Sequence, residues 1–431
     1  MTGHRPTPAT DAAERAASSR PAEYDVVIVG GGMVGAALAC ALGDGALRVA
    51  LIEPDWVAPL APGAAVEARV SALTCASQRI FENLGAWAAM HTLHGADGRA
   101  ETRVCAYTGM EVWDASGPGR IRFDAAAVGE PALGWIVENR VVQAALLARL
   151  GAFDNVDTLA GARVERCELH ADAVALALAD GRELRARLLV GADGAASRVR
   201  QWARLDTAGW GYDQRAVVCA VRTAQPHGHT AWQRFLPGGP LAFLPLFDGR
   251  CSIVWSTTPA AAEHLLGLDA AQFADELGSA FGRRLGAIEE VGARAAFPLR
   301  LQHTPHYVGA RVALIGDAAH VVHPLAGQGA NLGLLDAAAL AEVLLAAAAA
   351  GHDPGAFAVL RRYERWRKGD NLLMLAAMDG LKRLFGSPLA PLRLVRNVGL
   401  GLVDACTPAK TALARRAMGL AGDLPRLART A

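Results

Sequence analysis

The stretch from residue 25 to residue 53 constrains the fold of this chain more than any other. Asp25–Val29 is a short β-branched run of the kind that forms a strand buried on both faces. Gly30–Gly35, with the sequence GGGMVG, follows at once and satisfies G-x-G-x-x-G. Small residues at 36–42 predict a helix, and Arg48–Glu53 predicts a second strand that ends in a carboxylate.

Each part of this unit has a physical role in holding a dinucleotide. Gly30 allows a tight turn, Gly32 lets the backbone approach a pyrophosphate, and Gly35 lets helix and strand pack closely. The free N–H groups and the positive end of the helix dipole face the anion. Glu53 follows about twenty residues on, where an acid bonds a ribose hydroxyl. We therefore predict a dinucleotide site, with a plain glycine turn as the alternative.

Composition limits the other function classes. A chain of 431 residues is expected to form two or three lobes. A net charge of +1 gives no overall field that attracts nucleic acid. The seven cysteines are scattered without a C-x-x-C pair, so neither a zinc site nor a disulfide framework is implied, and we expect reduced thiols in a cytoplasmic protein.

The ends of the chain carry less information. Met1–Glu23 lacks the apolar core of a secretory signal and predicts a disordered extension. The run Ala338–Ala350 comes nearest to a membrane span, but Glu342 interrupts it and it is too short.

Two more predicted strands end in acidic turns. Residues 188–194 end in Asp193-Gly194, and residues 311–317 end in Gly316-Asp317. Ligands of open α/β sheets bind at this edge, although an ordinary Asp-Gly turn is the alternative at Asp193. The segment 323–333 contains Pro324, Gly327, Gly329 and Asn331, and its small residues allow a flat ring to approach the backbone. His320 and His323 lack a nearby completing ligand, so we expect no metal.

Three polar side chains are candidates for reaching back to the cofactor. Arg69 is either a solvated loop arginine or a phosphate or ribose contact. Arg140 and Gln143 lie three residues apart on one face of a predicted helix, 139–150, where they either cap and solvate the helix or touch the cofactor.

The middle of the chain is rich in predicted strands, whereas its end is basic and amphipathic. Residues 210–221, 230–247 and 250–256 predict an antiparallel sheet in a separate lobe. The apolar segment 235–245, with Phe243 and Leu244, either forms the wall of an apolar pocket or packs in the core. From Lys382 onward the chain contains nine basic and two acidic residues, with apolar residues interleaved among them. That pattern suits either a helix that covers the core with a solvated basic face or an element on a membrane surface.

Three separated signals carry a family resemblance: the glycine triplet with Glu53, the Gly191–Gly194 strand end, and Gly316-Asp317 with Pro324 and 327–329. The chain resembles the flavoprotein aromatic hydroxylases of the para-hydroxybenzoate hydroxylase type. Within them it is most similar to the FAD-dependent hydroxylases of ubiquinone biosynthesis, and the likeness covers roughly 25–402. The closer features are the segments 69–73, 135–140, 324–334 and 365–379 together with Phe385.

The resemblance implies roles for individual residues. Gly30, Gly32 and Gly35 match the pyrophosphate turn, and Glu53 matches the ribose acid. The other residues match positions beside the ribityl, phosphate and ring parts of FAD; they are Arg69, Arg140, Gln143, Asp193, Asp317, Pro324, Gly327, Gly329 and Asn331. The resemblance also credits Asp193 with a role in NAD(P)H binding. Pro324 and Gly327 stand as the catalytic candidates because of their position beside the flavin. No side chain stands out as a base for the phenol.

The resemblance also implies an activity. NAD(P)H reduces FAD, O₂ adds at C4a of the flavin, and the hydroperoxide transfers its distal oxygen to the ring of a polyprenylated phenol. The alternatives are the same chemistry on a small soluble aromatic compound, and a non-catalytic scaffold subunit. A quinone-biosynthesis protein complex and peripheral contact with the inner face of the cytoplasmic membrane stay open as partners.

The expected architecture is α/β with α+β inserts: a Rossmann-like FAD-binding lobe, an antiparallel β-sheet substrate lobe and a helical C-terminal region. We expect the first lobe to be discontinuous, over 24–100, 131–205 and 296–350. The substrate lobe takes 101–130 and 206–295, and the helical region takes 351–431.

Overall fold

A mixed, mostly parallel sheet forms one half of the protein in the computed structural model, which describes residues 22–94, 100–322, 328–387 and 389–430. Its strands run in the order β10-β2-β1-β13-β12-β11, with β21 beside β13 and β20 beside β21. The strand bounds are β1 Ala22–Val29, β2 Val49–Glu53, β10 Val156–Ala160, β11 Val164–Leu169, β12 Val174–Leu178, β13 Glu183–Gly191, β20 Val308–Gly309 and β21 Val312–Leu314.

The central strands of this sheet are parallel, and their middle or final residues, 26–28 in β1, 49–52 in β2, 188–191 in β13 and 312–314 in β21, are buried. β1 pairs in parallel with both β2 and β13, and β13 pairs in parallel with β21. Their uncharged β-branched cores have no exposed face, as expected for a sheet covered on both sides. β1 begins at Ala22 because Ala22 and Glu23 pair with β13, so the strand takes in the last two residues of the predicted extension. The rest of that extension, residues 1–21, lies outside the described residues.

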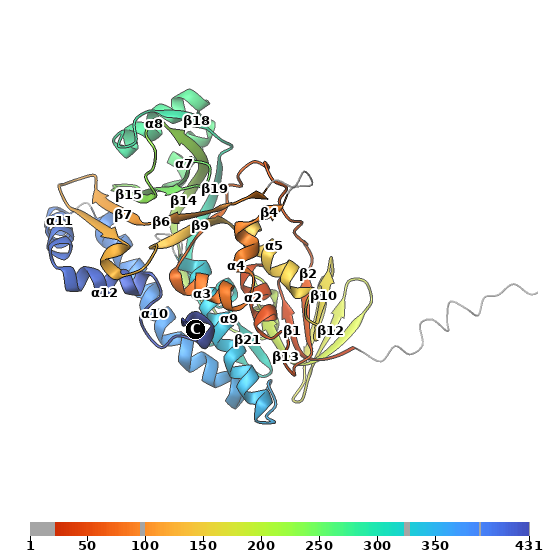
Figure 1. Ribbon diagram of the computed structural model, residues 1–431. Helices are drawn as coiled ribbons and strands as arrows, with labels where there is room; N and C mark the ends of the chain where they lie inside the picture. The colour runs from red at the N-terminus through yellow and green to blue at the C-terminus, as the bar shows by residue number, and fades with distance from the viewer. Residues whose placement is uncertain (1–21, 95–99, 323–327, 388, 431) are drawn as a thin grey trace, which may run out of the picture.

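Helices cover this sheet, as Figure 1 shows. The first group is α2 Met33–Ala41, α3 Cys75–Asn83, α4 Trp87–His91, α5 Asn139–Leu150 and α6 Arg198–Trp202. α9, Gln328–Ala349, packs against α2 and against α10, Phe357–Gly386. Among the described residues α9 is long and apolar enough to cross a membrane by length and composition, contrary to the sequence expectation, but 72% of its apolar window is buried inside the protein. It is the core helix of this half.

A mostly antiparallel sheet forms the other half (Figure 1), and within it β15 pairs in parallel with β7. Its order is β22-β19-β14-β17-β16-β15-β7-β8, with β18 beside β14. The bounds are β7 Gly109–Asp114, β8 Arg120–Asp124, β14 Ala208–Thr223, β15 Thr230–Leu236, β16 Gly239–Pro245, β17 Cys251–Thr257, β18 Ile288–Val291, β19 Ala295–His303 and β22 His320–Val321. α7 Pro259–Gly267 and α8 Ala270–Phe281 pack on one face. Because β19 pairs with β14, the strand pairing favours a second lobe that extends to residue 303.

A small sheet and a helical tail complete the chain. β3 Val70–Leu73, β9 Gly134–Glu138 and β6 Val104–Tyr107 pair antiparallel, and β4 Leu93–His94 pairs with β5 Ala100–Glu101. The tail contains α11 Ala390–Ala405 and α12 Thr407–Ala417, which lie at one edge of the molecule (Figure 1). Three short 3-10 turns occupy 126–128, 316–318 and 426–428.

The alternation of the strands separates two residues that were predicted to line one pocket. Successive side chains of β16 point to opposite faces of the sheet. Phe243 is fully buried on the helix side and stacks on Phe281 of α8 at 3.8 Å between ring centroids. Leu244 packs on the other side, in a cluster with Ala72 and Leu246. The assignment of Phe243 to a pocket wall was wrong, because it belongs to the core of the second half.

Candidate functional site

The glycine turn lies at the carboxyl edge of the parallel sheet, between β1 and α2. Gly30 has φ +105°, a conformation that L side chains rarely adopt, and a Cβ there would collide with the carbonyl of Ala192. A Cβ on Gly35 would collide with the carbonyl of Gly30. Gly32 differs, because no atom lies within 4 Å of the position its Cβ would take. Gly30 and Gly35 are therefore required for packing, whereas the absence of a side chain at Gly32 leaves open space above the start of α2.

Glu53 and Gln143 hold this turn from two sides. One carboxylate oxygen of Glu53 accepts a hydrogen bond from the Gly31 N–H at 2.6 Å, and the other accepts from the Asp55 N–H at 2.8 Å. Gln143 donates from Nε2 to the Gly31 carbonyl at 2.8 Å. Each Glu53 oxygen retains lone-pair capacity for a ligand hydroxyl. The sequence predicted a ligand role for both residues; the structure adds that they shape the turn.

A cavity of about 390 Å³ opens beside the turn. Gly30, Gly32 and Glu53 form one wall, and Asp193 and Arg198 lie on another. Glu53, Asp55 and Asp193 also line this cavity, and Arg198 donates to the carbonyls of Val164 and Glu165, so the feature that favours an anion is the start of α2 with its free N–H groups and helix dipole. The turn, the open space and the acid fit the pyrophosphate and ribose of a dinucleotide.

Asp193 has a structural task in addition to lining the cavity. One carboxylate oxygen accepts from the Ser197 hydroxyl at 2.5 Å. The other accepts from the backbone N–H groups of Arg198, at 2.7 Å, and Val199, at 3.2 Å. Asp193 therefore fixes the loop that leads into α6, as the alternative of an acidic turn implied.

The turn that carries Asp317 lies directly beside the glycine helix. A Cβ on Gly316 would lie 3.3 Å from Val34 of α2, and one on Gly333 of α9 would lie 2.7 Å from the same side chain. A Cβ on Gly329 would lie 3.9 Å from Oδ1 of Asp317. Motifs that are almost 300 residues apart in the sequence therefore meet at one place.

The charge of Asp317 is set by its neighbours. Asp317 is an exposed residue, but the protein around it removes part of its hydration and so raises its pKa, while the positive charges of His320 and Arg69 act in the opposite direction. Arg69 is exposed, and its guanidinium lies 5.9 Å from the ring centre of Phe297 in β19. This arrangement places Arg69 on the side of Asp317, between the two halves of the protein.

Arg140 and Asn331 are engaged within the protein. Arg140 donates to the Ala58 carbonyl at 2.8 Å and pairs with Glu67 at 3.0 Å. Oδ1 of Asn331 accepts from the Thr74 N–H at 3.0 Å and from the Ser77 hydroxyl at 2.7 Å. Asn331 is buried and ties α9 to α3, while Arg140 is half-buried and ties α5 to the loop after β2. Pro324 and Gly327 lie outside the described residues.

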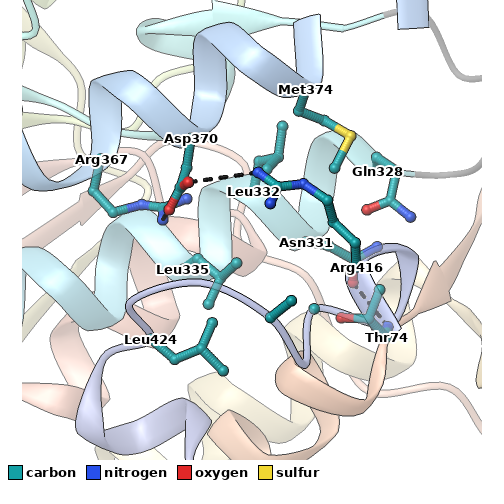
Figure 2. Close-up of a pocket in the computed structure, with 12 residues that line it drawn as sticks. Thr74, Gln328, Asn331, Leu332, Leu335, Arg367, Asp370, Met374, Arg416 and Leu424 are labelled. Atoms are coloured by element: carbon teal, nitrogen blue, oxygen red, sulfur yellow. Dashed lines mark hydrogen bonds and ion pairs between the residues drawn. The ribbon is translucent and has the colours of Figure 1, made fainter. Parts of the chain in front are cut away.

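Figure 2 shows how the C-terminal segment covers the start of α9. Arg416 of α12 reaches toward Asp370 of α10, with 3.7 Å between charged atoms. Gln328, Leu332 and Leu424 of the C-terminal segment line a cavity of about 40 Å³ near this contact. The C-terminal segment therefore packs over the helix that leads away from Asp317, and the partly exposed ion pair adds little to that packing.

A buried polar network missed by the sequence analysis supports the Gly316 turn. Asp336 of α9 is fully buried, and one of its oxygens accepts from His320 Nε2 at 2.5 Å and from the Gly316 N–H at 3.3 Å. The other accepts from Arg367 Nε at 2.9 Å and Asn371 Nδ2 at 3.0 Å. The available signal was a lone acid in an apolar helix, which must find a partner when buried.

These partners decide the ionisation of Asp336. Burial alone raises the pKa of Asp336, but His320, Arg367 and Asn371 together hold that pKa below its ordinary value. The carboxylate is therefore charged at neutral pH. His320 is committed to this pair, and no group of three or more His, Cys, Asp or Glu side chains within the described ranges is arranged to hold a metal ion.

Comparison with known proteins defines the class. Residues 23–369 match the family model of the FAD binding domain, and the chain belongs to this family. It is 42% identical to a ubiquinone hydroxylase, UbiL, of Rhodospirillum rubrum over 94% of this chain and 92% of that protein. It is 38% identical to the 3-demethoxyubiquinol 3-hydroxylase of Escherichia coli over 92% of this chain and 98% of that protein.

A solved structure has the same fold. The p-nitrophenol 4-monooxygenase PnpA of Pseudomonas putida superposes with a TM-score of 0.75 at 21% identity, covering 94% of this chain and 99% of that one. The expected architecture, an FAD-binding α/β lobe joined to an antiparallel sheet, is confirmed. The family membership also confirms the expected resemblance to FAD-dependent hydroxylases.

Proposed function

We propose that this protein is an FAD-dependent monooxygenase that hydroxylates the ring of a polyprenylated phenol in ubiquinone biosynthesis, with NAD(P)H and O₂ as co-substrates. The overall change is one oxygen atom inserted into an aromatic C–H bond, with the second oxygen released as water and NAD(P)H oxidised. The observation that carries the proposal is the meeting of the glycine turn, Glu53 and the Asp317 turn at one edge of the parallel sheet. The names of the relatives support the substrate class.

Different residues would contact different parts of FAD. Gly30, Gly32 and Gly35 would admit the pyrophosphate at the start of α2, and Glu53 would accept from a ribose hydroxyl. Gln143 keeps the turn in place through Gly31. When bound, FAD takes electrons from NAD(P)H and activates O₂ for transfer to the ring.

The Asp317 side of the site would hold the remainder of the cofactor. Asp317 offers a carboxylate beside Gly329, and Arg69 provides positive charge next to it. Asn331 acts by positioning, because it fixes the first turn of α9 against α3. We retain Asp193, Arg140, Pro324 and Gly327 as proposed contacts, the first two with the additional structural tasks described above.

The contact between the two halves supplies an apolar environment for the ring. Leu301 of β19, Val218 of β14 and Leu332 of α9 belong to one buried cluster that joins the antiparallel sheet to α9 and α10. With the cofactor bound, this cluster would keep water away from the face of α9 that leads to Gly329. Exclusion of water protects a reactive oxygen species from unproductive loss.

Product analysis with paired substrates tests the proposal. The purified, FAD-loaded protein is given NADPH and O₂ with a prenylated phenol or with the same phenol lacking its tail. We expect substrate-accelerated flavin reduction and one hydroxylated product from the prenylated compound, and much less from the tailless one. Equal turnover would favour a small soluble aromatic substrate. Absence of hydroxylated product from both, with hydrogen peroxide as the only fate of O₂, would contradict the proposal.

The setting of the reaction forms part of the proposal. A prenylated substrate resides in membranes, so we place the enzyme at the inner face of the cytoplasmic membrane as a peripheral protein. A complex with other quinone-biosynthesis proteins remains a prediction.

A further inference from the structure

The helix α11 carries large apolar side chains on its solvent side as well as on the side that packs on the protein. Leu394, Val395, Val398 and Leu402 lie on one side of α11, and all four are exposed, Leu394 to 67% and Leu402 to 65%. We call these four residues the α11 outer face. The side of α11 that packs on the protein carries the buried Arg396 and the half-buried Asn397, together with Leu400 and Val403, which pack on the cluster around Phe385. A surface helix normally has polar residues on its solvent side, where α11 has the outer face.

Specific polar contacts enforce this orientation. Arg396 is buried and pairs with Asp114 of β7 at 2.5 Å, and it donates to the Ser116 hydroxyl at 2.6 Å. Asn397 accepts from the Gly119 N–H at 2.7 Å and donates to Asp114 at 3.0 Å. Rotating α11 to bury its apolar residues would break the buried ion pair, which is costly. The outer face is therefore held toward solvent by the fold.

Further apolar side chains are exposed on the neighbouring elements. Exposed leucines occur on the second half of α10, in the segment that joins it to α11 and in the first turn of α11; they are Leu372, Leu373, Leu381, Leu389 and Leu392. Exposed apolar side chains gathered on adjoining helices mark an interaction site. The tail also lies at an outer edge of the molecule, where α11 is accessible (Figure 1).

The charges around α11 identify the kind of partner. Arg120 and Arg122 of the neighbouring strand β8 are exposed, whereas Arg393 of α11 lies on the side away from the outer face and donates to the Ser116 carbonyl. Asp404, the acid of α11, is paired with Lys410 at 3.2 Å and lies in the field of Arg120. An apolar helix face with an excess of arginine at its border is complementary to an anionic lipid surface. A second copy of the chain would bring two such borders together and repel.

We propose that the α11 outer face docks the protein onto an anionic membrane surface, with the four apolar side chains inserted among the lipids and the arginines on the headgroups. The inference rests on the proposed function for its purpose, since a prenylated substrate is drawn from the same membrane. The docking itself depends only on α11 and its border.

Vesicle binding by the FAD-loaded full-length protein tests this inference. The probes are vesicles of phosphatidylglycerol with phosphatidylethanolamine, and neutral vesicles of phosphatidylcholine. We expect binding to the anionic vesicles that weakens as salt is raised, and a loss of roughly tenfold or more when Leu394, Val398 and Leu402 are all changed to Ser. The matched control is Phe357→Ser, which removes an exposed aromatic side chain at the other end of α10 and should leave binding unchanged.

Several results would overturn the inference. They are no binding by the unaltered protein, equal binding to neutral vesicles, and full binding by the triple variant. A concentration-dependent dimer in light scattering that the triple variant loses, without vesicle binding, would instead assign the face to a second copy. Flavin absorbance verifies that each variant is folded.

Hydroxylation of a prenylated phenol in detergent separates the two proposals. The triple variant should match the unaltered protein there, because detergent replaces the membrane as the source of substrate. Vesicle binding without hydroxylation would contradict the proposed function alone. Hydroxylation in detergent without vesicle binding would contradict the docking surface alone.

Discussion

Replacement of Asp336 by Asn tests the buried network that supports the Gly316 turn. The carboxylate accepts from four donors, and Asn offers one acceptor oxygen and an NH₂ group that faces donors on its other side. Arg367 is 1% exposed and would lose its buried counter-ion, keeping only the partly exposed Asp370 at 3.7 Å. Removal of one partner from a buried ion pair costs about 3–5 kcal/mol. We expect Asp336→Asn to lose that amount, a third or more of the stability of a typical domain.

The assay is urea unfolding of the FAD-free protein, followed by tryptophan fluorescence. The control is Asp275→Asn in α8, because Asp275 pairs with Arg283 on the surface with both side chains more than half exposed. Such a pair contributes about 0–1 kcal/mol. A loss below about 1 kcal/mol for Asp336→Asn would refute the network as a support of the fold.

The dependence on pH adds a second check. Because the pKa of Asp336 is lowered in the folded protein, its stabilising contribution is complete above the ordinary carboxyl pKa of 3.8. That contribution disappears as the pH falls through the lowered value. The difference in stability between the unaltered protein and Asp336→Asn should therefore be constant near neutral pH and should shrink in acid below about pH 4. A difference that grows in acid would contradict the assignment of a charged carboxylate.

Three other substitutions probe the cofactor side. Gly32→Ala should leave the urea midpoint of the FAD-free protein unchanged, because the added Cβ meets open space. The same change should weaken FAD binding at least roughly tenfold in a fluorescence titration. Unchanged affinity for FAD would contradict the pyrophosphate assignment. Glu53→Gln should weaken FAD binding by about 1.5–3 kcal/mol through loss of a charged acceptor; equal affinity would remove Glu53 from the site. Asn331→Ala should destabilise the FAD-free protein by about 2–4 kcal/mol, because Thr74 and Ser77 lose their acceptor. An unchanged free energy of unfolding would contradict the positioning role of Asn331.

The dinucleotide unit was predictable because local sequence determines it. A β-branched strand, a glycine turn at φ +105°, a small-residue helix and a terminal acid each follow from residues within thirty positions. The second role of Glu53 was not predictable, because its bonds to Gly31 and Asp55 depend on how β2 ends relative to the turn. A sequence pattern identifies the type of residue that a site needs, but it does not show which protein groups that residue bonds.

Contacts between distant segments set the limits of prediction. Asp336 meets its partners across the packing of α9 against α10, which hydrophobic periodicity does not specify. Phe243 and Leu244 diverge because strand alternation assigns faces only once the register is known. The direction of α11 depends on the pair between Arg396 and Asp114, which are 282 residues apart. The amphipathic pattern was evident, but which side faces the protein was not.

The most direct test of the central claim is transfer of labelled oxygen. The FAD-loaded protein, NADPH and a prenylated phenol are incubated under ¹⁸O₂, and the product is analysed by mass spectrometry beside NADPH consumption. The account predicts one ¹⁸O atom in a new ring hydroxyl for each NADPH oxidised in coupled turnover. Oxidation of NADPH with unlabelled phenol and hydrogen peroxide as the only products would contradict it.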